Sequence, residues 1–171
     1  MGEQHVYHDV PLASIVNDYR VCRIFCMRVI MACVSWLAPN PKHNLTSAYR
    51  GAVFVIQQMV DEICACVPFH MVCFLLPLLL STRPINTLIQ NYDLQPIAKE
   101  LGQERNAAEG YGGYSLVWPL YVAANAETIP QEQRDWLSGR LMMIGTRFGL
   151  TSAQVLVLAR RHVLTCGPMF P

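Results

Sequence analysis

The spacing of apolar residues between Leu12 and Leu37 is the feature that most constrains the fold. Apolar side chains recur there every three or four residues, which is typical of one face of an amphipathic helix. We expect this stripe to be buried. It consists of Ile15, Tyr19, Cys22, Cys26, Val29, Ile30, Cys33 and Leu37. The polar residues on the opposite side, which we expect to face solvent, are Asn17, Arg20, Arg23 and Arg28.

The next two segments of the chain are predicted to be a helix and a loop. Two prolines and two asparagines within residues 38–44 predict the end of the first helix. A second helix is predicted over residues 46–66. Pro68 is expected to end it, because proline has no backbone N–H and its ring clashes with the preceding turn. The prolines and glycines of residues 81–111 then predict a loop-rich segment.

Three more helices are predicted after this loop. The segment GGYSLVWPLYVAA (112–124) predicts a helix bent at Pro119, in which large aromatic side chains pack against neighbouring helices. A fourth helix is expected to begin at Thr128, whose hydroxyl would cap the first turn, and to end at Gly149 in a left-handed conformation. A fifth helix is expected to begin at Thr151.

No segment alternates between apolar and polar residues as a half-buried strand would. The sequence therefore predicts an all-α fold, with about five to six amphipathic helices in one bundle-like domain. Its length fits a single domain over residues 1–171. The same helices could also form the C-terminal half of a larger helical domain.

Composition and charge exclude some classes of function. Hydrophobic residues make up 53% of the chain and charged residues 15%, so we expect its apolar surface to be covered by a partner, a further part of the protein or a membrane. The formal net charge is +1 without a basic run, which argues against direct binding of nucleic acid. The odd number of cysteines, seven, and the polar N-terminus favour an intracellular, reducing location.

A membrane-associated protein is the main alternative to a soluble helical domain. Residues 63–82 form an uncharged window of the length that a membrane-spanning helix needs. The window contains two prolines and His70, and no aromatic belt flanks it. We therefore favour a buried core segment and expect no membrane partner.

The sequence predicts no catalytic, cofactor-binding or metal-binding residue. The cysteine spacings C-x3-C at 22–26 and C-x-C at 64–66 differ from the C-x2-C pattern of structural zinc sites, so burial of these thiols is favoured. His70 and His162 could in principle activate a cysteine nucleophile, but no local signature supports this, and core histidines are favoured. A cysteine-dependent enzyme is thus the weakest hypothesis.

Three segments of the sequence carry a resemblance to a known family: NDYRVCRIF (17–25), EICACVPFH (62–70) and the run from GGYSLVWPLYVAA to the end of the fourth helix (112–150). Together they resemble the fungal-specific transcription factor domain, the regulatory region of fungal binuclear zinc-cluster transcription factors. The resemblance is strongest over 17–80 and 112–165. In that family, this region tunes the activity of an attached DNA-binding unit.

The resemblance implies a non-enzymatic regulatory role in the nucleus. The family's DNA-binding unit is a basic six-cysteine zinc cluster, and its pattern does not occur in this sequence, so no cofactor is expected here and zinc is expected only in that unit. The implied partner is the N-terminal part of a transcription factor or another regulatory protein, with a homodimer as a further option. The sequence also predicts that Trp118 is buried, with Tyr114 and Tyr121, as a packing signature.

Overall fold

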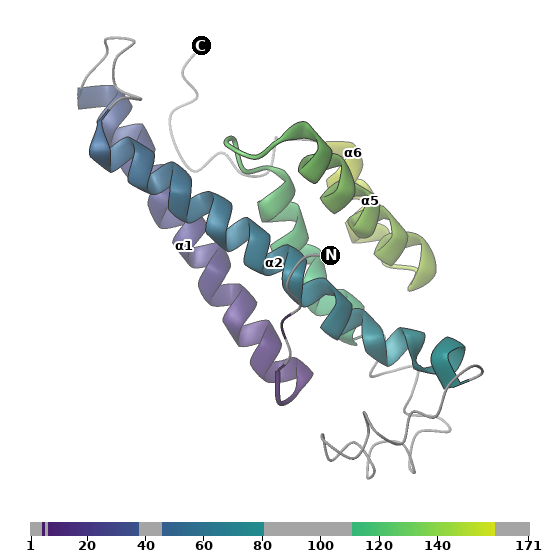
Figure 1. Cartoon of the computed structure of the whole chain (residues 1–171). Helices are drawn as coiled ribbons and strands as arrows, with labels where there is room; N and C mark the ends of the chain where they lie inside the picture. Colours follow the sequence, from purple (N-terminus) through teal and green to yellow (C-terminus); the bar gives the residue numbers. More distant parts are fainter. Residues whose placement is uncertain (1–4, 6, 38–45, 81–110, 160–171) are drawn as a thin grey trace.

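The computed structural model describes residues 5, 7–37, 46–80 and 111–159, and the regular structure within these ranges is entirely helical (Figure 1). This confirms the predicted all-α class. The helices are α1 (Val10–Leu37), α2 (Ser47–Leu80), a helix over residues 111–124, α5 (Gln131–Arg147) and α6 (Thr151–Ala159). The predicted loop-rich segment lies outside the described residues except for its last position.

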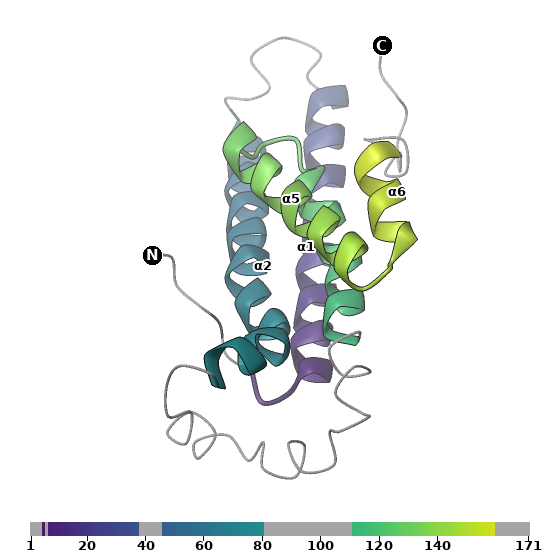
Figure 2. The same cartoon turned by 90° about the vertical axis from the view of Figure 1, so that its right-hand side faces the viewer.

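Helices α1 and α2 form a long antiparallel hairpin, and α5 and α6 lie together on one side of it (Figures 1 and 2). The helix over residues 111–124 is buried along most of its length and belongs to the core that joins these parts. Only Tyr111, Tyr114 and Trp118 are exposed along its length. Its buried side chains join those of the hairpin and of α5 in one hydrophobic core, which includes Ile24, Ile56, Ile63, Leu116, Leu120, Tyr121, Leu137, Leu141 and Ile144.

Two adjacent glycines allow the helix over residues 111–124 to approach its neighbours closely. A Cβ atom on Gly112 would lie 2.8 Å from the backbone oxygen of His70 in α2. A Cβ atom on Gly113 would lie 2.6 Å from the ring of Phe148, which follows α5. The paired glycines therefore let one end of this helix pack against both α2 and the end of α5.

The predicted orientation of α1 is wrong. The apolar stripe faces solvent, with Ile15 exposed by 65% and Val29 by 56%, whereas the predicted polar face contains Asn17 and Arg20, which are buried. Among the buried residues of α1 are also Ala13, Val21, Ile24 and Met31. The helix thus buries a face of small, apolar and hydrogen-bonded polar residues, since its polar side chains find partners in α2.

The prediction that Pro68 ends the second helix is also wrong, because α2 continues to Leu80. A proline inside a helix removes one hydrogen bond and costs about 3 kcal/mol. Val67, His70 and Met71 are all buried against the core directly around it. Their packing offsets the local cost of the proline.

Predictions for the C-terminal helices are confirmed in part. The helix over residues 111–124 continues through Pro119, and Gly149 has a positive φ of 67° after α5, as expected. Thr128 does not cap α5, whose N-cap is Pro130. Tyr121 is buried as predicted, but the prediction is wrong for Trp118, exposed by 41%, and for Tyr114, exposed by 63%, so neither fills the core.

Candidate functional site

A buried polar cluster lies where α1, α2 and the helix over residues 111–124 meet. The rest of the core is apolar, so the buried ionisable and hydrogen-bonding side chains of this cluster are the candidate site. Asn17, Arg20 and His70 are buried, each exposed by 4% or less. The cluster consists of Asn17 and Arg20 from α1, Glu62, Cys66 and His70 from α2, Ser115, and His5 from the N-terminal segment.

Arg20 contacts several other members of this cluster. Its Nε donates to Oε2 of Glu62 over 3.0 Å, and its Nη1 donates to Oδ1 of Asn17 over 2.7 Å. Its Nη2 lies 3.1 Å from Nδ1 of His5. The guanidinium carbon also stacks on the ring of Tyr7, 5.8 Å from the ring centroid. A buried guanidinium is costly unless it is paired and hydrogen-bonded, and each side of this one has a partner.

The arginine fixes the orientation of the Asn17 amide. A guanidinium can only donate, so the amide atom that faces Nη1 must be the carbonyl oxygen. The same oxygen accepts from the Cys66 thiol over 3.2 Å. The amide nitrogen of Asn17 then points at Nε2 of His70, 3.3 Å away.

The asparagine in turn fixes the tautomer of His70. Because Nε2 accepts from the amide of Asn17, the imidazole proton must be on Nδ1. Nδ1 lies 3.1 Å from Oγ of Ser115, which donates its own proton to the Gly112 carbonyl over 2.9 Å. Donors therefore run in one direction along the cluster, from the arginine through the asparagine and histidine to the serine and a backbone carbonyl.

This direction is the opposite of what nucleophilic catalysis requires. A general base must accept the proton of the nucleophile, but His70 donates to Ser115. Burial raises the pKa of the Cys66 thiol, which keeps it protonated and unreactive. Burial, and then the charge of Arg20, lowers the pKa of His70 to about 4, so the imidazole is neutral near pH 7. The cluster is suited to holding helices together.

The candidate residues from the sequence fall into three groups. His70 is a core histidine, as favoured, and one asparagine links it to Cys66. Cys22, Cys26 and Cys33 were expected to be buried but are exposed on α1, because that helix turns the other way. His162 lies outside the described residues. Within the described part of the chain, no group of three metal-ligating side chains comes together.

Sequence reasoning missed Asn17, Arg20 and Ser115 as members of the cluster. The only local signal was the spacing of Asn17 and Arg20, three residues apart on one face of a helix. Their partners on α2 are more than 40 residues away in the sequence, and no periodicity reveals such a pairing.

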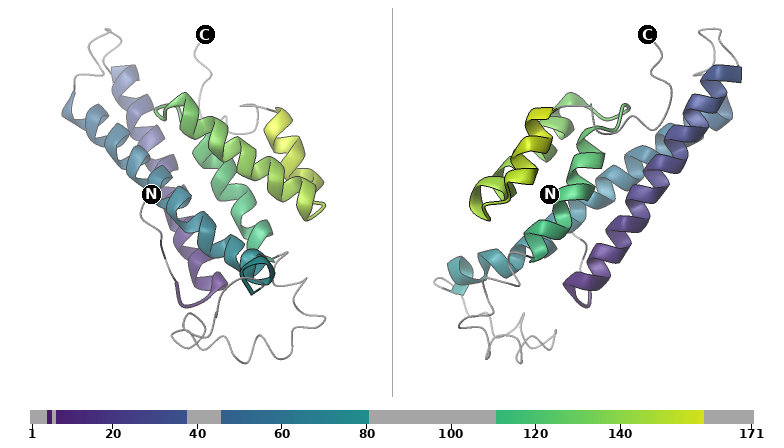
Figure 3. Two further views of the ribbon diagram at one scale, coloured as in Figure 1. Left: turned by 45° about the vertical axis from the view of Figure 1, so that its right-hand side comes forward. Right: turned by 180° about the vertical axis from the view of Figure 1, so that it is seen from behind.

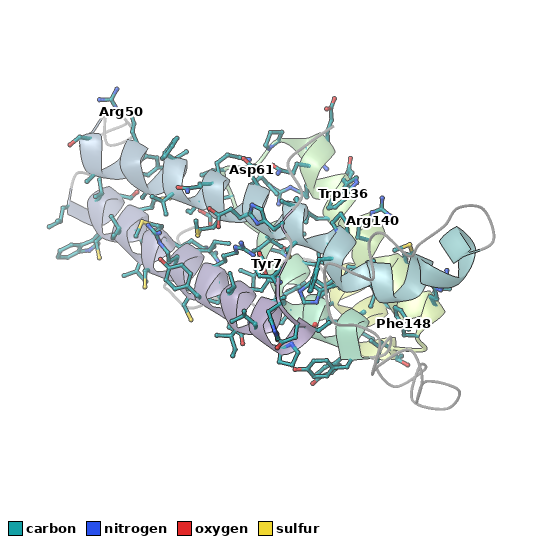
Figure 4. The ribbon with its side chains drawn as sticks, turned by 60° about the horizontal axis from the view of Figure 1, so that its bottom comes forward. Tyr7, Arg50, Asp61, Trp136, Arg140 and Phe148 are labelled. Atoms are coloured by element: carbon teal, nitrogen blue, oxygen red, sulfur yellow. The ribbon has the colours of Figure 1, made fainter. Side chains whose placement is uncertain are left out.

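A second feature is an open groove between α2 and α5, with a volume of about 750 Å³. Figure 4 shows Asp61 of α2 and Trp136 and Arg140 of α5 along this part of the molecule. Gln133 bridges the two helices, since it donates to Asp61 over 2.7 Å and accepts from Gln57 over 2.9 Å. Arg140 lies 5.0 Å from the centroid of the Trp136 ring. The hydrogen bonds of Gln133 therefore join α2 and α5 beside the groove.

By length and composition, one stretch of α2 could span a membrane. This stretch, Ser47–Met71, has a mean hydropathy of 1.5, and 39% of it is buried within the protein. Core helices of soluble proteins also have this length and composition. It overlaps only part of the predicted window of residues 63–82.

The whole chain is similar to part of a fungal transcription factor. It is 25% identical over 171 residues to the transcription factor dbaG of Emericella nidulans. The alignment covers 98% of this chain and 36% of the relative, so the chain spans about a third of that protein's length. No family model matches the chain, and no solved structure matches it.

Proposed function

We propose that this chain is a non-enzymatic regulatory region of a fungal transcription factor, of the type found in the fungal-specific transcription factor domain. The observation that carries the proposal is the similarity to a transcription factor along the entire chain. The three resembling segments, residues 17–25, 62–70 and 112–150, supply helices that meet at the buried polar cluster. The region acts in the nucleus, through contacts with other parts of a transcription factor or with regulatory proteins.

The chemistry of the described residues supports a regulatory role over an enzymatic one. In the polar cluster, His70 donates a hydrogen bond to Ser115 and does not accept its proton, and the Cys66 thiol stays protonated. The formal net charge of +1 over the whole chain offers few cations to neutralise phosphates, and that neutralisation supplies most nonspecific affinity for DNA. In this proposal, DNA recognition belongs to a separate unit.

A reporter assay tests this function. The chain is fused to a heterologous DNA-binding domain and expressed in a fungal cell with a reporter gene under that domain's binding site. We expect the fusion to raise or lower reporter output relative to the DNA-binding domain alone. A Glu62→Ala fusion, which leaves Arg20 buried without its carboxylate, should lose the effect, whereas Val155→Lys on the exposed face of α6 should keep it. Reporter output equal to that of the DNA-binding domain alone would refute the regulatory role.

The length and hydropathy of Ser47–Met71 favour a second candidate, a membrane-associated helical protein. Carbonate extraction of cell membranes separates the two functions, because it strips peripheral proteins and leaves spanning helices in the pellet. We expect the chain in the supernatant or the nuclear fraction. Recovery in the carbonate pellet would support the membrane candidate.

A further inference from the structure

The exposed apolar residues of α1 follow a heptad repeat. From Leu12 to Trp36 they are separated alternately by three and four residues, which is the spacing of the a and d positions of a coiled coil. All of these residues are exposed. The a positions are Leu12, Tyr19, Cys26 and Cys33, and the d positions are Ile15, Cys22, Val29 and Trp36. At 1.5 Å per residue, this seam is roughly 36 Å long.

Burial along α1 follows the same repeat. Every exposed residue between Pro11 and Leu37 occupies an a, d, e or g position. No residue at a b, c or f position is exposed, and Ala13, Asn17 and Arg20, which belong to this set, are buried. One half of the helix surface therefore packs within the protein, and the complementary half has apolar residues at the a and d period of a coiled-coil strand.

The residues at the e and g positions beside the seam form pairs of opposite charge or of apolar side chains. In a parallel coiled coil, each g residue meets the e residue five positions further along the partner. For α1 this rule pairs the g-position carboxylate of Asp18 with the e-position guanidinium of Arg23. The other pairs join apolar residues: Pro11 with Val16, Phe25 with Ile30, and Ala32 with Leu37.

We propose that α1 is a dimerisation helix that pairs with α1 of a second copy of this chain, in parallel and in register. A two-fold axis along the seam makes the Asp18–Arg23 pair twice, once on each side. An antiparallel pairing matches g with g and e with e, so it never brings Asp18 and Arg23 together. The complementary charges lie on the same helix, which favours a second copy over a different partner.

The place of α1 in the fold leaves room for this pairing. α1 forms the outer side of the hairpin, away from α5 and α6 (Figure 3). Phe25, at a g position, lies against Trp118, with 6.5 Å between the ring centroids. Because Trp118 is itself exposed by 41%, the apolar surface extends past the seam on the g side. The proposal concerns assembly, and it does not depend on a role in transcription.

The first experiment measures the molecular mass of the purified chain by analytical ultracentrifugation over a range of concentrations. We expect a dimer that dissociates on dilution. Val29→Asp puts a charge at a d position and should raise the dissociation constant at least 100-fold without loss of helicity. Val155→Asp is a matched control, because this valine of α6 is exposed by 55% and Val29 by 56%. A monomer at every concentration, or a dimer equally sensitive to both substitutions or to neither, would overturn the proposal.

The second experiment determines orientation with the three thiols of the seam. The background replaces Cys64, Cys73 and Cys166 with alanine and keeps the buried Cys66. Each variant then retains one thiol of the seam, and a short bifunctional thiol reagent is added. The retained thiol is Cys22, Cys26 or Cys33.

In a parallel, in-register dimer each of these thiols faces its own counterpart, so all three variants should yield covalent dimers. In an antiparallel dimer a residue meets its own counterpart only at the two-fold axis, so at most one variant would cross-link, which would overturn the proposed orientation. If the chain is a monomer with freely reactive thiols, the seam is exposed in this chain and its partner is a different protein. If the chain is a monomer with protected thiols, another segment of the same chain covers the seam. Both monomer outcomes overturn the proposal.

Charge reversal tests the pairing of Asp18 with Arg23. Asp18→Arg should weaken the dimer by about tenfold, because it places two cations side by side in both g–e pairs. Arg23→Asp added to this variant exchanges the charges and should restore the wild-type dissociation constant. Equal weakening in the single and double variants would show that the two residues do not meet, and would overturn the register.

Discussion

Acidification should destabilise the protein through His70. The imidazole is buried and neutral, and its pKa is lowered from 6.5 to about 4 by desolvation and then by the charge of Arg20. Protonation would put a hydrogen on Nε2, which faces the amide N–H of Asn17 at 3.3 Å. His70 therefore binds a proton less readily in the folded protein than in the unfolded chain.

The pH window and the magnitude follow from these two pKa values. Between pH 6.5 and about 4 the unfolded state binds more protons than the folded state, so the free energy of unfolding falls as the pH falls. The contribution is fully present above pH 6.5 and is lost on passing below pH 4. At about 1.4 kcal/mol per pH unit, the complete loss is about 3 kcal/mol, most of which is gone at pH 4.5. This is a large share of the stability of a typical domain.

Urea denaturation followed by circular dichroism at pH 7.0 and pH 4.5 measures this effect. His70→Gln is the matched variant, because glutamine can form hydrogen bonds at this position but does not titrate. Carboxylates titrate in both proteins, so their contributions cancel in the comparison. We expect wild type to lose about 2–3 kcal/mol more than His70→Gln between the two pH values. An equal loss in both proteins, or a His70 imidazole that titrates near pH 6.5 by NMR, would refute this account of the cluster.

Three other perturbations test separate parts of the fold. Glu62→Ala should lower the free energy of unfolding, measured by urea denaturation, by about 3 kcal/mol because it leaves the buried charge of Arg20 without its carboxylate. Glu62→Gln keeps a hydrogen-bond acceptor and should lower it by only about 1 kcal/mol. Gly112→Ala should cost about 1–3 kcal/mol because its Cβ would lie 2.8 Å from a backbone oxygen of α2, and Gly139→Ala, in open space on α5, should stabilise by up to about 1 kcal/mol. Burial raises the pKa of Cys64 to about 11, so at pH 8 it should react with a thiol reagent about 100-fold more slowly than an unstructured cysteine; an equal rate would contradict its burial.

The helical content of the chain could be predicted from the sequence because it depends on local periodicity. The predicted range for the first helix, Leu12 to Leu37, nearly coincides with α1. Gly149 was also recognised correctly, since a left-handed residue after a helix favours glycine for local steric reasons. The end of α2 was not predicted correctly, because the packing of residues distant in the sequence offsets the local cost of Pro68.

The candidate site could be predicted only in part, for a related reason. His70 was recognised as a core histidine from its apolar neighbours in the sequence. Its partners Asn17 and Ser115 lie 53 and 45 residues away, so their contribution depends on the tertiary fold. The face of α1 was misassigned for the same reason. Hydropathy identifies an apolar stripe but does not distinguish a stripe that packs in the monomer from one that awaits a partner.

The reversed orientation of α1 leads to a last prediction, in which hydropathy and the structure give opposite answers. Hydropathy predicts that Ile15→Lys unfolds the chain and that Asn17→Leu stabilises it. In the structure, Ile15 is exposed by 65%, so lysine there should change the free energy of unfolding of the dilute monomer by no more than about 0.5 kcal/mol. Asn17 is fully buried, and leucine there would leave Arg20 and His70 without their shared partner, at a cost of about 3 kcal/mol.

Urea denaturation of both variants at a concentration below the dimer dissociation constant gives the order directly. The two positions are two residues apart on the same helix, so differences in helix propensity and in the unfolded chain are small beside the expected gap. A larger loss for Ile15→Lys than for Asn17→Leu would mean that α1 buries its apolar stripe within the monomer. The heptad seam would then be part of the core, and the pairing of two copies through α1 would be ruled out together with the polar cluster as the anchor of this helix.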